Sequence, residues 1–192
     1  PDTVQNILNY SFAETAISEV VLGDGVTMVG DYAFNGSAVE KVTLKAGVEY
    51  GMGAYVDTAV SDLTVEDGVD SISTAMFIGC TDLTVLVLPA SITEISDSAF
   101  EGSGLREVHL AGDGEIFIGM NSFAVGTEEQ PVTLRVYTDR AVDQFDGFVL
   151  GSYATAEVEP YTGIGPGSSG DAVVWAVAAV ILAAVVAGLV LG

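Results

Sequence analysis

The chain has 192 residues, of which 49% are hydrophobic, enough for one domain of ordinary size with a substantial core. Acidic residues outnumber basic ones 27 to 5, so the formal net charge is −22, which argues against electrostatic binding to nucleic acid or to an anionic lipid surface. Such an acidic surface suits a secreted or high-salt setting, although a lineage that uses little lysine would give the same composition. A single cysteine, Cys80, excludes an internal disulfide and a thiolate metal cluster.

A regular spacing appears in the first residues and recurs along the chain. Apolar residues stand eight and five positions before an aromatic ring: Val4 and Ile7 before Phe12, Val26 and Val29 before Phe34, Val69 and Ile72 before Phe77, Ile92 and Ile95 before Phe100. This spacing suits a compact turn that leads into a short helix or 3₁₀ segment and places a large ring in the interior. We therefore expect the chain to begin in the middle of a repeat, as a fragment of a longer array with an uncapped apolar edge.

The turn around each ring carries further markers. The heptapeptides DYAFNGS (31–37) and DSAFEGS (97–103) lie three units of 22 residues apart, and similarity at a fixed period predicts a stacked array of repeats. A glycine two residues after the ring predicts a tight reversal in three copies, at Gly36, Gly79 and Gly102. In the copy at Tyr55, Thr58 stands in place of this glycine, which predicts an irregular turn.

A second pattern, apolar-x-x-apolar-x-apolar, follows each turn. Its copies begin at Ile17, Val39, Val60, Leu83 and Leu105, with spacings of 22, 21, 23 and 22 residues, and a looser sixth copy comprises Pro131, Leu134 and Val136. The last two apolar positions of each copy are two residues apart, so they face the same side of a short strand. Stacking the copies predicts a parallel sheet that runs along the array.

The residues that alternate with these apolar positions would point away from the core. We predict that they form a protein-binding face consisting of Glu19, Val21, Lys41, Thr43, Asp62, Thr64, Val85, Val87, Glu107 and His109. In this face Val85 and Val87 would make an apolar patch flanked by charge. A solvent-exposed face without a partner is the open alternative.

The units LTVLVLPASITEISDSAFEGSG (83–104) and AMFIGCTDLTVLVLP (75–89) resemble the BspA-like class of leucine-rich repeat. The resemblance covers about residues 1–140, although proline follows the strand only at Pro89 and the unit from Leu105 to Arg140 is longer, as in a distorted or capping repeat. The resemblance implies a cell-surface protein of bacteria, archaea or some protists that acts in adhesion or protein binding. It also implies that the chain is not an enzyme.

The residue patterns indicate no catalytic, cofactor or metal site. Cys80 and His109 are the only residues of their kinds, and neither has a partner that would form a nucleophile and base. The GxGxxG match at 165–170 follows no strand, and the Asp-Gly pairs at Asp24, Asp67 and Asp113 fit turns better than calcium loops. Two sequons, at Asn9 and Asn35, could accept glycans in an exported chain.

The C-terminal part differs from the repeats. Residues 160–171, PYTGIGPGSSGD, indicate a linker, and residues 172–191, AVVWAVAAVILAAVVAGLVL, are apolar and uncharged throughout. At ~1.5 Å per residue, a helix of that length would cross a hydrocarbon core of ~30 Å. We predict a transmembrane helix with the repeats outside the cell. Small residues such as Ala184 and Gly188 could allow weak helix pairing, although a plain lipid-facing helix is favoured.

These patterns together predict an α/β repeat solenoid of the leucine-rich-repeat type over residues 1–159, with short parallel strands and turns or short helical segments, followed by the linker and the transmembrane helix. The predicted function is a membrane-anchored cell-surface domain for protein binding or adhesion, without catalysis, cofactor or metal. The alternative is a passive spacer or coat component that presents an upstream domain.

Overall fold

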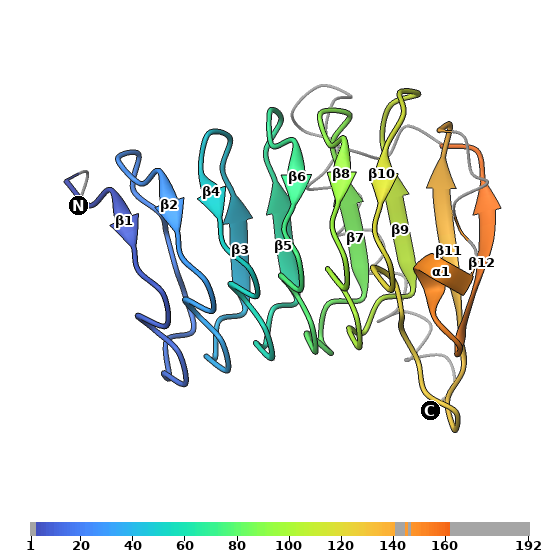
Figure 1. Cartoon of the computed structure of the whole chain (residues 1–192), viewed down its shortest axis with the longest axis horizontal. Coiled ribbons are helices and arrows are strands. Elements are labelled where there is room, and N and C mark those ends of the chain that lie inside the picture. Colours follow the sequence, from blue (N-terminus) through green and yellow to red (C-terminus); the bar gives the residue numbers. More distant parts are fainter. Residues whose placement is uncertain (1–2, 141–144, 146, 162–192) are drawn as a thin grey trace, which may run out of the picture.

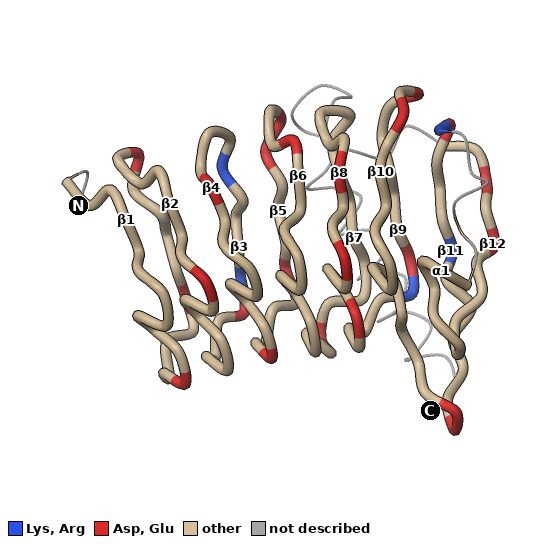
Figure 2. The backbone as a smooth tube through the Cα atoms, in the orientation of Figure 1, with Lys and Arg blue, Asp and Glu red and all other residues tan. Residues whose placement is uncertain are grey.

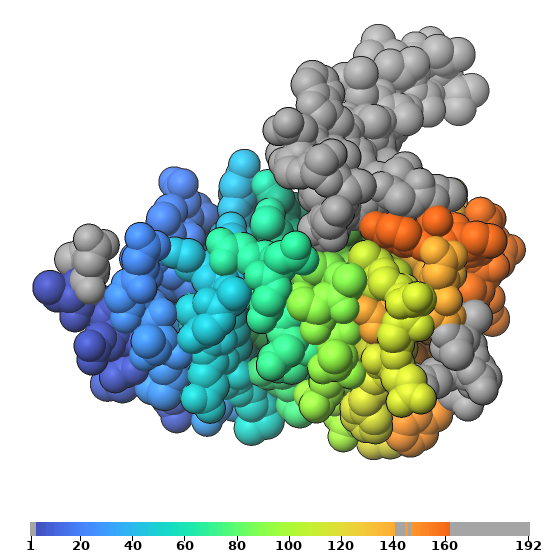
Figure 3. All heavy atoms as spheres, turned by 90° about the horizontal axis from the view of Figure 1, so that it is seen from above, coloured from blue at the N-terminus to red at the C-terminus, as the bar shows by residue number. Residues whose placement is uncertain are grey.

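The computed structural model describes residues 3–140, 145 and 147–161. In this part the chain forms a solenoid whose layers follow one another along its long axis, from the N-terminal end to the last strand (Figure 1). Seen from above, the layers keep their sequence order without interleaving (Figure 3). The predicted transmembrane helix at 172–191 and most of the predicted linker lie outside the described residues. Within them, no helix is long and apolar enough to cross a membrane.

One side of the solenoid is built from the longer strands, all of which pair in parallel. They form a pair, β3 (Lys41–Leu44) and β5 (Asp62–Val65), and a sheet of β7 (Val85–Leu88), β9 (Glu107–Leu110), β11 (Val132–Thr138) and β12 (Ala154–Glu159). An isolated bridge between Glu19 and Lys41 continues this ladder to the first layer. The predicted parallel stacking of these strands is confirmed.

The opposite side is a second parallel ladder, made of two-residue strands. Its two groups are β1 (Asn6–Ile7), β2 (Met28–Val29) and β4 (Glu49–Tyr50), and then β6 (Ser71–Ile72), β8 (Glu94–Ile95) and β10 (Phe117–Ile118). The residue five positions before each ring is the inward-facing member, and Val29, Ile72 and Ile95 are fully buried. The sequence pattern did not distinguish these strands from the turn that follows them.

The segment around each ring is a turn, so the helical alternative for this segment was wrong. In the first five layers, the residues two before and two after the ring have positive φ, for example Tyr32 at 53° and Gly36 at 64°. A helix needs φ near about −63°, so two left-handed residues four apart prevent one. The only helix in the described chain is the four-residue α1 (Gly147–Leu150), at its C-terminal end.

The third turn is regular, contrary to the expectation based on Thr58. The residue two after Tyr55 is Asp57, and it adopts the left-handed conformation with φ of 53°. Asp tolerates this conformation better than most residues other than glycine. Thr58 lies one position later, where it is buried and its hydroxyl donates to the carbonyl of Tyr55 at 2.9 Å.

Strand β11, which comes from the sixth copy of the sequence pattern, is displaced from its expected register. The sequence pattern aligns Leu134 with Val108, whereas β11 pairs Val136 with Val108 and Thr138 with Leu110. A shift of two residues keeps the same side chains facing inward, so alternation alone cannot detect it. The extra length lies in an exposed loop at residues 127–131.

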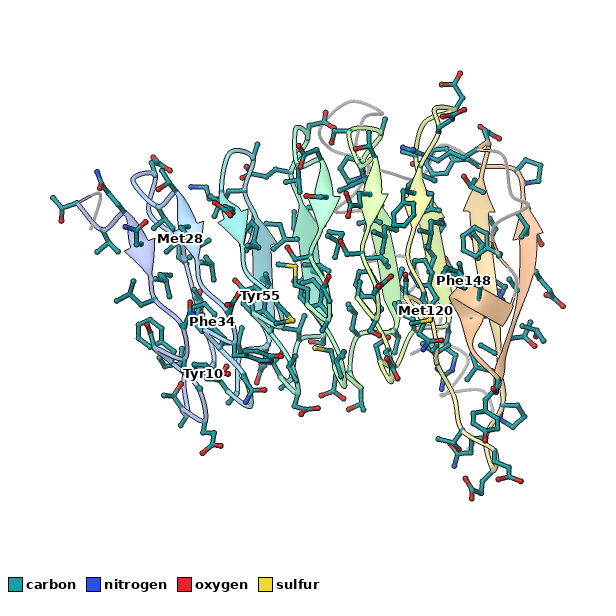
Figure 4. All side chains as sticks on the ribbon, viewed as in Figure 1. Tyr10, Met28, Phe34, Tyr55, Met120 and Phe148 are labelled. Carbon is teal, nitrogen blue, oxygen red and sulfur yellow. The ribbon has the colours of Figure 1, made fainter. Side chains whose placement is uncertain are left out.

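Aromatic rings stack through the centre of the solenoid. Phe12, Phe34, Tyr55, Phe77, Phe100 and Phe123 form a column with centroid separations of 5.2–5.6 Å and interplanar angles of at most 8°. Figure 4 shows Phe34 and Tyr55 in neighbouring layers. Each inner ring therefore contacts a ring on both faces, which fixes the distance between layers.

A second column ties the turns together through side-chain oxygens. Asn9 Oδ1 accepts from the Asp31 amide at 2.9 Å, Asp31 Oδ1 from the Met52 amide at 2.9 Å, and Asp97 Oδ1 from the Met120 amide at 2.8 Å. Each of these oxygens fills the place that a Cβ would take in the next layer, at Gly30, Gly51 and Gly119. Each Asx residue in this column thus requires glycine in the layer that follows.

The buried Arg140 holds the loops of the last layers together. Its guanidinium donates to the carbonyls of Ala111 at 2.9 Å, Ala90 at 3.1 Å and Gly114 at 3.3 Å. The side chain reaches loops from two preceding layers, and the residue is 4% exposed. Arg140 therefore acts as a structural clamp.

We expect Phe77→Ala to lower the free energy of unfolding by about 3–5 kcal/mol, because it leaves a cavity between two stacked rings. Phe12→Ala should cost clearly less, since Phe12 is 36% exposed and has a ring on one face only. Urea unfolding followed by far-UV circular dichroism measures both. Equal losses would contradict a stack that depends on contacts from both sides.

A glycine substitution tests the Asx column. In Gly51→Ala the new Cβ would lie 2.6 Å from both the backbone nitrogen and Oδ1 of Asp31, so we expect a loss of about 1–3 kcal/mol. Gly114→Ala is the matched control, since nothing lies within 4 Å of its Cβ position, and its effect should stay within about 0.5 kcal/mol. Similar midpoints of urea unfolding for the two variants would rule out the close approach at Gly51.

Candidate binding surface

The predicted binding residues lie on the outer side of the long-strand ladder, in two columns. In the first, Lys41 stands opposite Asp62 and Val85 opposite Glu107; in the second, Thr43 stands opposite Thr64 and Val87 opposite His109. The residues between them, among them Val42, Leu44, Leu86 and Val108, are buried. The alternation of inward and outward positions is therefore as expected.

Exposure divides this surface into two parts. The first three layers expose six of the predicted residues, here called the exposed ladder: Glu19, Val21, Lys41, Thr43, Asp62 and Thr64. Val85, Val87 and Glu107 are half-buried, and His109 is only 5% exposed. Val85 and Val87, the predicted apolar patch, are therefore only partly exposed, and Val21, at 84% exposure, is the most exposed apolar residue of the face.

His109 is held in place by its neighbours. Its ring stacks on Tyr137 with centroids 4.6 Å apart, and its Nε2 lies 2.6 Å from Oε1 of Glu107. Strand pairing puts Val87 on one side of His109 and Tyr137 on the other. His109 is therefore packed among its neighbours and buried, contrary to the expectation that it faces solvent.

The columns continue beyond the predicted residues. Arg135 and Glu157 extend the first column, and Tyr137 and Glu159 extend the second. The sequence pattern missed them because it placed β11 two residues out of register and did not include β12. The alternation from Val132 to Thr138 is the signal that could have found Arg135 and Tyr137.

The first column carries charges of both signs. Glu19, Lys41 and Asp62 are neighbours by register, and Lys41 Nζ lies 3.6 Å from Asp62 Oδ2. Both side chains of this pair are exposed, so it stabilises the fold by at most about 1 kcal/mol. Of the five basic residues of the chain, Lys41 and Arg135 lie in the outer columns. The other three are engaged elsewhere: Lys45 binds Asp24 at 2.7 Å, and Arg106 and Arg140 donate to backbone carbonyls. Acidic residues occupy the loops on both sides of the strands (Figure 2).

Cys80 is fully buried inside the solenoid. Its Sγ lies 3.2 Å from the carbonyl oxygen of Tyr55 and 3.3 Å from Oγ1 of Thr58. Burial raises the pKa of this thiol, which opposes formation of a thiolate. Cys80 therefore contributes packing.

The acidic residues of the turns form hydrogen bonds and an ion pair with groups in neighbouring layers. The Lys45 ammonium donates a hydrogen bond to Asp24 and lowers the pKa of that carboxyl, and a Glu66 oxygen accepts from the Ala46 amide at 3.2 Å. In the part of the chain that the structure describes, no group of three or more His, Cys, Asp or Glu side chains could hold a metal ion. The GxGxxG match at 165–170 lies outside that part.

The two sequons differ in accessibility. Asn9 is exposed, although its side chain joins the Asx column, whereas Asn35 is half-buried and the hydroxyl of Ser37 is buried. Glycosylation at either asparagine stays a prediction.

Of three comparisons with known proteins, one gave a match. A family model described as BspA type leucine rich repeat region matches residues 5–128 in six copies. Searches of curated proteins and of solved structures gave no match. The matched range covers the layers from Asn6 through Phe123, which include the whole exposed ladder.

We expect Cys80 to react with a thiol reagent only when the chain unfolds. Burial and a raised pKa should keep the folded protein unlabelled by 5,5′-dithiobis(2-nitrobenzoate) during one hour, with full labelling in denaturing urea. Absorbance of the released thiolate measures both. Rapid labelling of the folded protein would contradict the packing role.

Proposed function

The chain belongs to the BspA-type leucine-rich repeat family, and on that premise we propose that it is a cell-surface domain that binds another protein through the exposed ladder. Repeat solenoids of this family are often surface proteins for binding and typically lack catalysis. The observation that carries the proposal is the open set of outward side chains on the first three long-strand layers. We further propose that residues 172–191 anchor the chain in a membrane, on their apolar sequence alone.

The rigidity of the exposed ladder favours binding. Strand pairing fixes Lys41 beside Asp62 and Thr43 beside Thr64, so their order is already set before a partner arrives. A preorganised surface loses little conformational entropy on association. The ladder is therefore better suited to recognition than the loops.

Charge defines the kind of partner. The ladder mixes Glu19, Lys41 and Asp62 with neutral threonines, while the surrounding loops are acidic. A partner would therefore present a near-neutral centre with basic residues around it, and association would slow as salt is added. A typical interface buries about 800 Å² on each partner, so the contact would extend from the ladder to flanking loops such as the one containing Asp24.

An added arginine tests this surface. Thr64→Arg places a long cation on the third layer of the exposed ladder, and we expect it to raise the dissociation constant at least about tenfold, or about 1.4 kcal/mol. Ser71→Arg is the control, because Ser71 is an exposed outward residue on the opposite ladder and the charge change is the same. Ser71→Arg should change the dissociation constant by less than about twofold.

Biolayer interferometry with the full chain in mild detergent provides the measurement. The probes are fibronectin, laminin, type IV collagen and surface proteins purified from the producing cells. Binding of none of them, or equal effects of the two substitutions on every binder, would reject the proposed surface. That result would favour the alternative, a passive spacer that presents another domain.

A further inference from the structure

The outward side of the short-strand ladder changes from polar to apolar towards its C-terminal end. Ser71 on β6 stands opposite Ser71's neighbour in register, Glu94 on β8, and Glu94 stands opposite Phe117 on β10. All three side chains are exposed, and Phe117 is 59% exposed. In the last of these strands a phenyl ring therefore takes the place that a hydroxyl and a carboxylate take in the two layers before it.

The turns beside this ladder change in the same way. One position in each turn, here called the turn column, has a carbonyl that accepts an amide of the preceding turn at 2.8–3.0 Å: Thr74, Asp97, Met120 and Phe148. Met120 is 46% exposed and Phe148 56%. Figure 4 shows Met120 and Phe148 in the last layers of the solenoid. The outward residues Phe117, Met120 and Phe148 are here called the apolar corner.

The apolar corner is confined to the last layers. Between Met52 and Phe117, a range that the structure describes throughout, no large apolar side chain is exposed. The repeat fold therefore does not require apolar residues at these outward positions. Exposed apolar side chains that gather in one place indicate a surface that is covered by a partner.

The chain continues from the last layer towards an apolar segment. Strand β12 belongs to this layer, and the amide of Tyr161 donates to Oδ1 of Asp139 at 3.1 Å. As a flexible coil, the predicted linker residues 162–171 would span about 17 Å. Layers lie about 4.8 Å apart, so Met52, three layers before Met120, is about 14 Å farther from the last layer. A membrane anchor at 172–191 would therefore hold the apolar corner nearer to the bilayer than the middle layers.

We propose that the apolar corner inserts into the interfacial region of a zwitterionic bilayer, the same bilayer that holds residues 172–191. The proposal rests on the proposed anchor and is independent of the exposed ladder. Phenylalanine side chains on a surface suit the boundary between headgroups and acyl chains, where their burial stabilises the contact. The carboxylates of Glu94 and Asp97 stand one layer away, and their repulsion would oppose contact with anionic lipid.

A second copy of the chain fits the apolar corner less well than a bilayer does. A stable protein interface buries about 800 Å² on each partner, which three side chains do not supply. A symmetric contact would also bring the carboxylates of Glu94 and Asp97 in one copy towards those of the other. A zwitterionic bilayer imposes neither condition.

Two matched methionines allow a direct test. Met120 and Met52 hold the same turn position, since their amides donate to Asp97 at 2.8 Å and to Asp31 at 2.9 Å, and they are 46% and 44% exposed. Each is replaced separately, by Met120→Trp or Met52→Trp, in the full chain. Both variants also carry Trp175→Phe, because Trp175 is the only tryptophan of the chain. Each protein is reconstituted as one copy in a phosphatidylcholine nanodisc.

Tryptophan fluorescence quenched by a nitroxide lipid, labelled near the headgroup end of its acyl chain, measures the contact. We expect at least about threefold stronger quenching for Met120→Trp than for Met52→Trp, because only position 120 would reach the interface. Adding Phe117→Glu to Met120→Trp should reduce the quenching to the level of Met52→Trp, since it continues the column of Ser71 and Glu94 with a charge. Circular dichroism checks that each variant is folded.

The unsubstituted chain separates failure of the anchor from failure of the corner. Quenching of Trp175 together with equal quenching at positions 120 and 52, whether weak or strong, would overturn the proposal and leave the anchor in place. Absence of Trp175 quenching would reject the anchor, and the proposal with it. A dimer in detergent that Phe117→Glu dissociates would assign the apolar corner to a second copy.

Discussion

The structure depends on the requirement that each side chain pack against its counterpart in the adjacent layer. Parallel strands in register permit no sideways adjustment, so a residue meets nearly the same neighbour position in every layer. The ring column satisfies this requirement with flat side chains, at separations of 5.2–5.6 Å. The Asx column satisfies it by pairing an oxygen in one layer with a glycine in the next. The ring column and the Asx column therefore both depend on one regular spacing between layers.

Much of this arrangement can be predicted from the sequence, because inward positions must be apolar and must recur. The copies beginning at Val39, Val60 and Leu83 predict β3, β5 and β7, and the rings at Phe34, Phe77 and Phe100 mark the turns. The left-handed residues before each ring were not predictable in the same way. Tyr32 and Ala75 have no strong preference for positive φ, so the layer contacts impose this conformation on them.

The outward side of the ladder was harder to predict than the inward side. Alternation assigns Thr43, Val87 and His109 to the same side of their strands, and it is correct. It contains no information about which outward residues stay open, since that depends on contacts between residues far apart in sequence, such as the ring of Tyr137 on His109. The displaced register of β11 hid this contact, because a shift of two residues leaves the hydrophobic pattern unchanged.

The same packing requirement separates the parts of the molecule that can change from those that cannot. A substitution at Phe77, Gly51 or Arg140 affects neighbouring layers, because each of these residues fills or spans a gap between layers. A substitution at Thr43 or Thr64 alters the exposed face and leaves the buried Val42 and Val65 in place. Sequence variation can therefore accumulate on the exposed ladder at little cost in stability. A repeat domain that recognises different partners would vary most easily at these positions.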